Sequence, residues 1–385
     1  MAHAILSASG ASRWMACTPS ARLEEQFPDS TSEYAKEGTL AHELCELKVR
    51  KNLIEPMHTR TYNSKLKKLK EHELWQDEMD KHTDTYLEYI QGLVHSYSCT
   101  PAVMVEKKVD FSSYVPDGFG TADCIIIADG TLHVIDFKYG KGVAVSAENN
   151  PQMKLYGLGA YLEYSFLYAI DKVKMTIVQP RLDEVISEYE ISTSELIEWA
   201  EEVVKPLADM AYKGEGTYIA GNHCRFCRAK ATCRARARMN LEVAKFDFKK
   251  PPLLSDEEVG EALKQAQDLA KWAEDLKDYA LAESLKGKLI PGWKAVEGRG
   301  SRSFVNMDAA FATLCEHGYD ESMLYERKPL SVAQIEKLIG KEGIQTLLEG
   351  LVEKSPGKPT LVVDTDKREA ITNKTTAVED FKEEI

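Results

Sequence analysis

The stretch "HVIDFKYG", residues 133–140, has the pattern of a buried strand that ends in charged residues. Ile135 and Phe137 are apolar, yet Asp136 lies between them and Lys138 follows two positions later. Because successive strand side chains point to opposite faces, Asp136 and Lys138 share one face. Burying a carboxylate and an ammonium together is costly unless both are paired or bind an ion. The pattern therefore indicates a chemical site at the end of a strand.

A second acid precedes this strand in "GFGTADCII", residues 118–126, where Asp123 opens another apolar run. Asp129-Gly130 favours a tight hairpin between the two strands, so Asp123 and Asp136 can converge at one end of a sheet. Two carboxylates repel at that distance unless one is protonated or a divalent cation lies between them. With Lys138 beside them, the set suits metal-assisted hydrolysis of a phosphoryl substrate. A surface hairpin with unrelated charges is the alternative, and an isolated D-x-K pattern would favour it.

Helical and strand periodicities alternate along the first two hundred residues. Leu40, Leu44 and Leu47 recur at helical spacing behind a Thr39 cap, and helical signals continue to about residue 98. Further helices are expected from Pro151 and from a capping box at Ser192 and Glu195, and strands at 102–111, 122–127, 132–137, 173–181 and 185–192. This order predicts an α/β fold in which helices flank a mixed central sheet.

The chain is expected to contain two domains joined by a proline-containing linker. The first covers residues 1–245, the linker covers 246–255 with Pro251-Pro252, and a helical or mixed extension covers 256–385. The extension should contain one long helix, from about Ser255 to Lys286, and two short helices at 331–340 and 342–351. A fragment ending near Leu254 is therefore expected to fold.

Composition restricts the class of protein. The 385 residues include 49 basic and 62 acidic side chains, and the net charge is −13, so nucleic-acid binding would require a local basic patch. The first residues lack a basic n-region followed by a long apolar stretch, and no apolar run approaches a membrane span. Eight unevenly spaced cysteines in a long chain indicate a reducing compartment. We expect a cytoplasmic protein that does not bind membranes.

Three further residues could join the acidic site. His42 lies on the first strong helix, off its leucine stripe, and could donate an imidazole nitrogen to the same metal. Gln152 and Tyr156 are four residues apart on the helix that follows the D-x-K strand, and so lie on one helix face. Taken alone, each of these residues is more often a hydrogen-bonded surface or core residue.

A cysteine cluster lies in "NHCRFCRAKATCRARARMN", residues 222–240, which contains Cys224, Cys227 and Cys233. Three thiols within ten residues of a cytoplasmic protein indicate a metal or iron–sulfur ligand set rather than disulfides. Cys17 is the first candidate for a fourth ligand and Cys45 the second. Cysteines outside the ligand set are expected to be buried thiols: Cys45, Cys99, Cys124 and Cys315.

The same segment supplies a basic patch without acidic residues, formed by Arg225, Arg228, Lys230, Arg234, Arg236 and Arg238. Such a run can be a solvated face, but beside a site that hydrolyses phosphoryl substrates it is expected to contact DNA phosphates.

Taken in order, the motifs resemble the RecB-like branch of the PD-(D/E)XK nuclease superfamily. The series is His42, G-x-x-D ending at Asp123, Asp136-Phe137-Lys138, and Gln152-x-x-x-Tyr156. The resemblance implies a PD-(D/E)XK nuclease core with an N-terminal helical segment and a C-terminal α-rich extension. It also implies that His42, Asp123, Asp136 and the Phe137 backbone carbonyl bind Mg²⁺ or Mn²⁺. Lys138 would be catalytic, Gln152 and Tyr156 would lie beside the active site, and Glu106 would match a further acidic position.

The cysteine spacing is similar to that of the iron–sulfur nucleases of this branch, the AddB-type and CRISPR-adaptation enzymes. The resemblance implies a [4Fe–4S] cluster held by Cys17, Cys224, Cys227 and Cys233, which would join the two ends of the nuclease domain. Zinc is the alternative, because four cysteines suit both. More loosely, the chain resembles a family of bacteriophage and prophage proteins assigned to this nuclease branch, including "SASGASRW" near the start and "SPGKPTLV" near the end.

The function implied is a metal-dependent deoxyribonuclease, an exonuclease or end-processing enzyme of phage or prophage recombination, replication or repair. It would act on single-stranded DNA or duplex ends in the bacterial cytoplasm, and residues 256–385 would bind phage recombination or replication proteins. The motifs leave exonuclease, endonuclease and polarity open. A non-catalytic DNA-binding or scaffold protein with a structural four-cysteine site is the rival interpretation. A zinc-dependent transcription factor would leave the buried charges unexplained.

Overall fold

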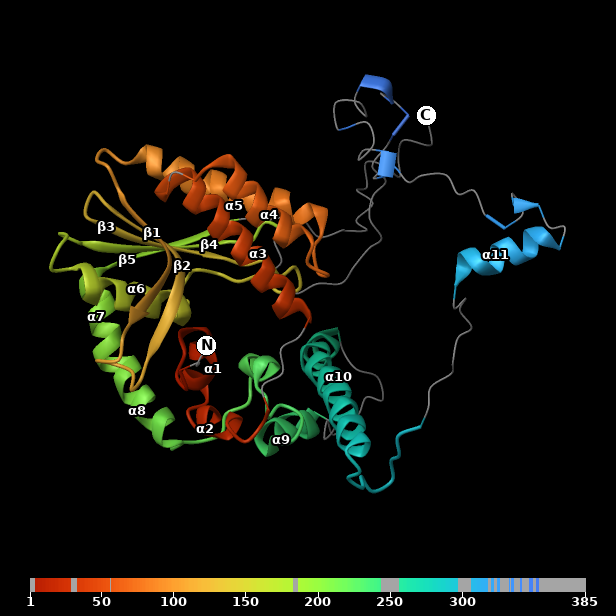
Figure 1. Ribbon diagram of the computed structural model, residues 1–385. Coiled ribbons are helices and arrows are strands. Elements are labelled where there is room, and N and C mark those ends of the chain that lie inside the picture. The colour runs from red at the N-terminus through yellow and green to blue at the C-terminus, as the bar shows by residue number, and fades with distance from the viewer. Residues whose placement is uncertain are drawn as a thin grey trace, which may run out of the picture. The chain divides into compact units, whose positions relative to one another are not determined.

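The computed structural model describes residues 4–28, 33–55, 57–182, 186–243 and 256–296, with shorter stretches between 306 and 352. A five-stranded sheet has the spatial order β1-β2-β3-β4-β5 (Figure 1). Its β3 and β4 are parallel, and the other neighbouring pairs are antiparallel. The strands are β1 (Ala102–Asp110), β2 (Phe119–Ala128), β3 (Thr131–Phe137), β4 (Lys172–Val178) and β5 (Ile186–Ser192). The expected mixed sheet is confirmed.

The burial of each strand follows its place in the sheet. Central β3 is buried along its whole length, including its polar residues Thr131, His133 and Asp136. Edge strand β5 is buried only in part and carries polar residues at alternate positions. The expected β2–β3 hairpin is confirmed at Asp129-Gly130, where both residues have positive φ, 48° and 73°. This is the backbone that a tight two-residue hairpin turn requires.

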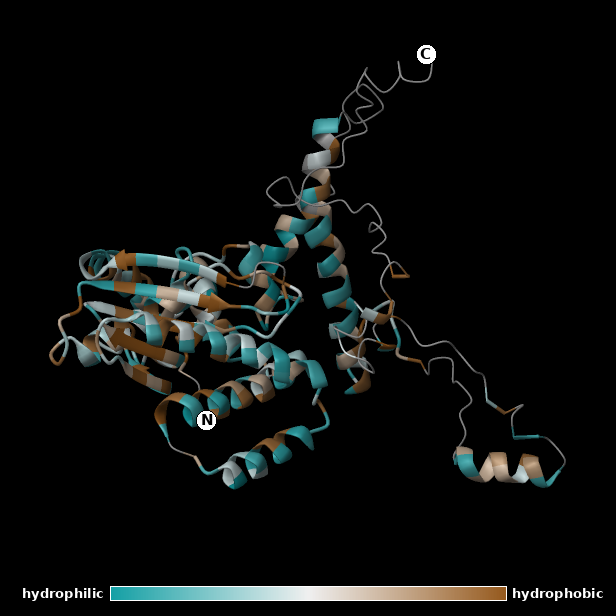
Figure 2. Cartoon of the chain, turned by 90° about the horizontal axis from the view of Figure 1, so that it is seen from above, coloured by the Kyte–Doolittle hydropathy of each residue, from teal (hydrophilic) through white to brown (hydrophobic). Residues whose placement is uncertain are grey.

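Helices cover both faces of the sheet (Figure 1). One face packs on α3 and α5 through residues such as Leu44 and Tyr86, and the other packs on α6 through Leu155 and Leu158. In Figure 2, the strands contain hydrophobic segments, and the helices around them carry both hydrophobic and hydrophilic residues. The helices of this part are α1 (Ala11–Ala16), α2 (Ser20–Glu24), α3 (Glu33–Val49), α4 (Thr59–Lys70), α5 (Asp77–Ser96), α6 (Pro151–Tyr164), α7 (Thr193–Trp199), α8 (Lys205–Lys213), α9 (Arg234–Val243) and α10 (Asp256–Leu285).

Local sequence signals account for two of these helices directly. Asn150 caps α6 by accepting the backbone N–H groups of Gln152 and Met153, and proline occupies the first turn. Ser192 and Glu195 form the expected capping box of α7. Both starting points agree with the sequence prediction.

The N-terminal helices are held against residues two hundred positions later. The Thr18 hydroxyl donates to the Glu215 carbonyl at 2.6 Å, and Arg22 Nε donates to the Tyr212 carbonyl at 2.6 Å. The buried Glu24 carboxylate pairs with Arg13 at 2.7 Å and accepts the backbone N–H of Arg228 at 2.7 Å. These contacts place α1 and α2 beside the segment that contains the cysteine cluster.

The chain separates into two units, Met1–Val296 and Glu297–Ile385. The expected linker, residues 246–255, lies outside the described residues, but α10 belongs to the first unit. The long helix is present, whereas the short helices expected at 331–340 and 342–351 lie mostly outside the described residues. The second unit contains α11 (Met307–Glu316), which Asn306 caps by accepting the Ala309 N–H at 3.0 Å.

Helix α10 packs on α9 through a buried ion pair. Arg236 on α9 is 0% exposed and donates to Asp275 on α10 at 2.6 Å and to Asp268 at 3.2 Å. Trp272 on α10 donates its indole N–H to the Ala231 carbonyl at 3.2 Å. A fragment ending near Leu254 would lack all three partners, so we expect the shortest stable fragment to end near Val296 instead.

The change Asp275→Ala should lower the free energy of unfolding by about 3 kcal/mol. Removing one partner of a buried pair leaves the other charge uncompensated, although Asp268 still contacts Arg236. Urea denaturation measures the effect. Asp278→Ala, an exposed change on the same helix, removes the same charge and should alter stability by less than about 0.5 kcal/mol. Equal effects of both changes would contradict the packing role of Asp275.

Candidate active site

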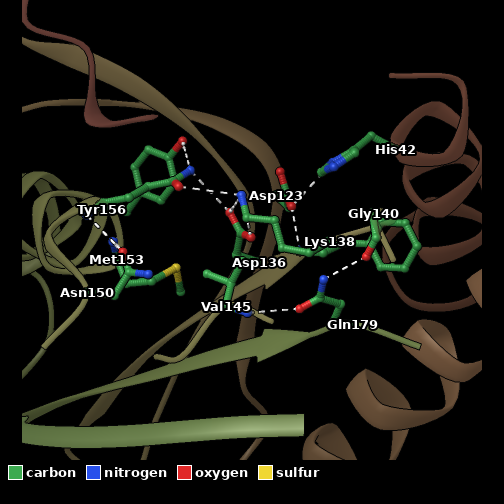
Figure 3. Close-up of polar contacts among 12 residues, drawn as sticks. His42, Asp123, Asp136, Lys138, Gly140, Val145, Asn150, Met153, Tyr156 and Gln179 are labelled. Atoms are coloured by element: carbon green, nitrogen blue, oxygen red, sulfur yellow. Dashed lines mark hydrogen bonds and ion pairs between the residues drawn. The ribbon is translucent and has the colours of Figure 1, made fainter. Parts of the chain in front are cut away.

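The predicted site residues meet at one end of the sheet (Figure 3). His42 comes from α3, Asp123 from β2, and Asp136 from β3, whereas Lys138 directly follows β3. The remaining two, Gln152 and Tyr156, come from α6. The backbone N–H of Lys138 donates to the Val178 carbonyl at 2.9 Å and so continues the β3–β4 pairing past the last residue of β3.

Asp123 lies between the histidine and the D-x-K strand. Its Oδ2 accepts the Phe137 backbone N–H at 2.7 Å and lies 3.3 Å from His42 Nδ1. Burial opposes ionisation of Asp123, but His42, Lys138 and the Phe137 N–H together lower its pKa. Burial also favours neutral His42, yet the Asp123 carboxylate raises the pKa of His42 to about 9. Without a metal, the two residues therefore form an ion pair.

Asp136 and Lys138 form a second, more deeply buried pair. Asp136 is 2% exposed, and its Oδ2 lies 3.0 Å from Lys138 Nζ. Burial raises the pKa of Asp136 even though Lys138 counteracts it. Burial lowers the pKa of Lys138, but the carboxylates of Asp136 and Asp123 outweigh it and leave the pKa raised. Lys138 is therefore a fixed cation at the site.

The α6 residues complete the hydrogen bonding of this pair. Gln152 accepts from Lys138 Nζ at 3.4 Å, and its amide donates to Asp136 Oδ1 at 3.4 Å and to the Tyr156 hydroxyl at 3.1 Å. A chain of contacts thus runs from the lysine to the tyrosine. Gly120 on β2 allows the ring to approach, because a Cβ there would lie 2.6 Å from Tyr156 Cε1.

Glu106 on β1 also contributes to the site, through an unusual backbone. The register Val105↔Cys124 and Lys107↔Ala122 places Glu106 opposite Asp123, and Glu106 has φ 50°. A non-glycine residue in the left-handed region is strained, and such strain clusters at functional sites. Burial, followed by repulsion from Asp123, raises the pKa of Glu106 to about 7.

The donor set fits a divalent cation. One potential ligand atom from each of His42, Glu106 and Asp123 lies within 4.8 Å of the others. Asp136 Oδ2 is buried and, despite its ion pair with Lys138, has no aligned hydrogen-bond partner. Carboxylate oxygens suit Mg²⁺, and a single imidazole is compatible with Mn²⁺. These four residues could hold such an ion, which would also relieve the repulsion among the carboxylates.

Metal-free protein should lose stability as the pH rises from 7 to 10. His42 has a pKa of about 9 when folded against an ordinary 6.5, so its contribution is complete below about pH 6.5 and disappears through pH 9. The full shift would correspond to about 3 kcal/mol, and the 30% exposed side chain reduces our expectation to roughly 2 kcal/mol. Urea denaturation in EDTA at several pH values measures this loss. In a plot of the free energy of unfolding against pH, His42→Gln should remove this decrease between pH 7 and 10. An unchanged decrease in the variant would contradict the ion pair.

Gln179 was not predicted from the sequence, although it is buried next to the site (Figure 3). Its side chain binds the backbone of Gly140, Val143 and Val145, in the loop after Lys138. A glutamine directly after an apolar strand is too common a pattern to have indicated this role.

The four predicted cysteine ligands line one cavity. Cys17, at the end of α1, lies there with Cys224, Cys227, Cys233 and His223. Burial and then Glu24 raise the pKa of the Cys227 thiol to about 12, so deprotonation would require a bound cation. The second-choice ligand, Cys45, instead packs in the core between α3, α5 and the sheet.

The remaining cysteines are only partly as expected. Cys45 and Cys124 are buried, whereas Cys99 and Cys315 are exposed, so the expectation of buried thiols was wrong for the latter two. Cys99 lies in the exposed segment between α5 and β1. The apolar character of a cysteine did not show whether it would lie in such a segment or in the buried core.

The basic patch is smaller than its sequence suggests. Arg225, Arg234 and Arg238 are exposed, and Arg228 is half-buried. Arg236 is a correction, because the buried ion pairs with Asp268 and Asp275 make it unavailable to a phosphate. Lys230 also pairs with Asp275, at 2.9 Å. The spacing of the arginines in the sequence could not show which of their side chains pack against α10 and which remain exposed.

Comparisons with solved structures found loosely similar proteins. For SSO0001 the identity is 17% and the TM-score 0.23, covering 57% of this chain and 95% of that one. For LHK-Exo in complex with dAMP the identity is 13% and the TM-score 0.24, covering 45% of this chain and 91% of that one. For the alkaline exonuclease LHK-Exo from Laribacter hongkongensis the identity is 12% and the TM-score 0.24, covering 45% of this chain and 87% of that one.

No helix within the described residues is both long and apolar enough to cross a membrane. At the level of sequence families, residues 3–369 match DUF2800, described as "Protein of unknown function (DUF2800)". Because the match covers nearly the whole chain, the chain belongs to the DUF2800 family.

Proposed function

We propose that this protein is a metal-dependent deoxyribonuclease that hydrolyses phosphodiester bonds at the Asp123–Asp136–Lys138 site. One observation carries the proposal: acids from three strands, a histidine and a lysine converge where the strained Glu106 faces Asp123. Asp136 has a buried carboxylate oxygen that accepts no hydrogen bond. An ion pair with a purely structural role would not need such an oxygen, whereas a metal site would use it.

The residues would divide the chemistry between binding and charge stabilisation. His42, Asp123, Asp136 and the Phe137 carbonyl, with Glu106, would hold Mg²⁺ or Mn²⁺. A bound divalent cation polarises a phosphoryl oxygen and lowers the pKa of a water molecule. Lys138, held by Asp136 and Gln152, would orient the attacking water or stabilise charge on the phosphate oxygens. Tyr156 would position Gln152 through the 3.1 Å hydrogen bond.

Incubation with end-labelled single-stranded and duplex DNA tests the activity. We expect cleavage with Mg²⁺ or Mn²⁺ and none in EDTA. Mononucleotide products would indicate an exonuclease, and internal fragments an endonuclease; the label's position gives the polarity. DNA binding without cleavage under all of these conditions would favour the rival function, a non-catalytic DNA-binding or scaffold protein.

The cysteine site is proposed to hold a [4Fe–4S] cluster, with zinc as the alternative. The support is that Cys17 reaches the cavity of Cys224, Cys227 and Cys233 from the other end of the domain. In the described parts of the chain, no three of these thiols lie within 4.8 Å of one another. Metal analysis of the purified protein distinguishes a cluster from zinc.

Changing Arg234 and Arg238 together to alanine should weaken DNA binding without regard to sequence. Both are exposed, and each lost phosphate contact should flatten the slope of log K against log salt by about 0.7 on single strands. Titrations at several salt concentrations measure the slope. The exposed Lys172 and Lys205, changed together, remove the same charge elsewhere and should leave the slope unchanged. Equal slopes for both variants would mean that the arginines only solubilise the protein.

The biological setting proposed is phage or prophage recombination, replication or repair, acting on single strands or duplex ends. Its support is the sequence resemblance, which implies partner contacts for residues 256–385; of these, residues 297–385 form the second unit. Co-purification of tagged full-length protein and of a fragment ending at Val296 from infected cells tests this assignment. Equal recovery of phage proteins with both would contradict a partner-binding role for the second unit.

A further inference from the structure

One buried side chain, Gln179, holds the loop that follows Lys138, residues 140–145. Gln179, directly after β4, is 4% exposed. Its amide donates to the Gly140 carbonyl at 2.6 Å and to the Val143 carbonyl at 2.8 Å, and its Oε1 accepts the Val145 N–H at 3.1 Å. The amide therefore uses both donors and its acceptor on this loop. Figure 3 shows Gln179 directed at Gly140 and Val145, beside Lys138.

A second contact holds the far end of the same loop. The Ala147 N–H donates to the Ser187 hydroxyl of β5 at 3.0 Å. Within the part of the loop that Gln179 holds, Gly140, Lys141 and Gly142 are exposed, and among the described residues their N–H groups donate to no backbone carbonyl. The loop is thus fixed at its base and open at its tip.

Neither glycine at the tip is explained by the protein's own structure. A Cβ at Gly140 or Gly142 would meet nothing within 4 Å, and neither residue has a positive φ. The remaining physical advantage of glycine is that it lets another molecule approach the backbone closely. Together with exposed N–H groups that donate to no described carbonyl, this leaves the backbone open to an anion.

The charge of the loop points to the same ligand. Lys141 lies between the two glycines, and no interaction joins it to another residue in the described parts of the chain. Residues 137–147, "FKYGKGVAVSA", contain two lysines and no acid, in a protein of net charge −13. Such a local excess of positive charge attracts a polyanion that the whole molecule would repel.

We propose that residues 140–143 bind a backbone phosphate of the DNA strand next to the scissile phosphodiester, with Lys141 as the cation. Gln179 is a positioning residue that holds the loop ready for this contact. Lys141 is three residues from Lys138, a distance of at most about 11 Å along the chain, so the bound phosphate lies close to the cleaved bond. The proposal rests on the nuclease function and names the part of the substrate that the loop recognises.

Binding of a labelled oligonucleotide in EDTA tests the loop without cleavage. Lys141→Ala should weaken binding about fivefold and lower the salt slope by nearly one contact. Lys172→Ala, at the opposite end of the sheet, removes the same charge and should leave binding unchanged. Oligonucleotides with one neutral methylphosphonate, scanned across the cleavage position, locate the contact. When the methylphosphonate lies at one position next to the cleaved bond, Lys141→Ala should cause no further loss of DNA affinity.

Gln179→Glu tests the positioning role, because it keeps the acceptor for Val145 but loses both donors to the loop. It should weaken binding by a similar factor, and combining it with Lys141→Ala should add little. A merely structural defect would instead lower the melting temperature and add fully to the effect of Lys141→Ala.

Three results would overturn the proposal. The first is a DNA affinity of Lys141→Ala equal to that of the wild type. The second is a loss of affinity by Lys141→Ala that persists at every methylphosphonate position. The third is full additivity of Lys141→Ala and Gln179→Glu. Because these measurements need no cleavage, failure of the loop proposal is distinct from failure of the nuclease function, which the Mg²⁺ and Mn²⁺ assay reports.

Discussion

Replacing Asp136 by asparagine is expected to lower the rate of Mg²⁺- or Mn²⁺-dependent DNA cleavage at least about a hundredfold. The change removes the negative charge of Asp136, which we propose as a metal ligand and which holds Lys138 Nζ at 3.0 Å. A loss of about 3 kcal/mol of transition-state stabilisation corresponds to such a factor. Lys138→Ala should have an effect of similar size, because no other described cation lies within ion-pair distance of Asp136. Initial rates on labelled DNA measure both.

The stability of the Asp136→Asn protein separates catalysis from folding. Burial raises the pKa of Asp136, so its negative charge is less favourable in the folded than in the unfolded protein. Asparagine supplies a neutral side chain of the same shape, and the Asp123 carboxylate remains as a counter-charge for Lys138. The metal-free variant should therefore melt at or above the temperature of the wild type. Asp171→Asn, an exposed change at the opposite end of the sheet, should leave the rate unchanged. Cleavage by Asp136→Asn at the wild-type rate would exclude this site.

Cys17→Ala is expected to remove the metal that we propose for the cysteine site and to destabilise the protein by several kcal/mol. If Cys17 and Cys224 bind one group, they close a loop of about two hundred residues. In the chain-entropy picture, such a closure restricts the unfolded chain by about 5 kcal/mol, although strain and residual structure reduce the gain. Iron and zinc analysis of anaerobically purified protein, together with thermal melting, measures both effects.

The composition of the cysteine site follows from the same measurements. A [4Fe–4S] cluster would give brown protein with about four irons per chain, whereas one zinc per chain would give colourless protein. Cys99→Ala changes an exposed thiol and should alter neither metal content nor melting. Full metal content in Cys17→Ala would contradict its role. His223, which lines the same cavity, would then replace it better than Cys45, which packs elsewhere.

Some features of the protein follow from the sequence alone because they depend on neighbouring residues. The hairpin at Asp129-Gly130 depends on local backbone preference, and the start of α6 depends on Asn150 and proline. Asp136 and Lys138 share a face because a strand has a period of two. The order of helices and strands, and hence the mixed sheet, was therefore predictable. So was the meeting of Asp123 and Asp136, since one hairpin joins their strands.

Other features depend on contacts between distant segments, and only the tertiary structure decided them. The exposed-looking Arg236 is buried because α10 places Asp275 beside it, thirty-nine positions along the chain. Glu106 faces the acids through a left-handed φ that no periodicity reveals. Gln179 holds the loop after Lys138 only because β4 pairs with β3. The local sequence pattern predicts which helices and strands form. The burial of a given side chain depends instead on which elements pack against each other, and the hydrophobic period of one element does not show which element becomes its neighbour.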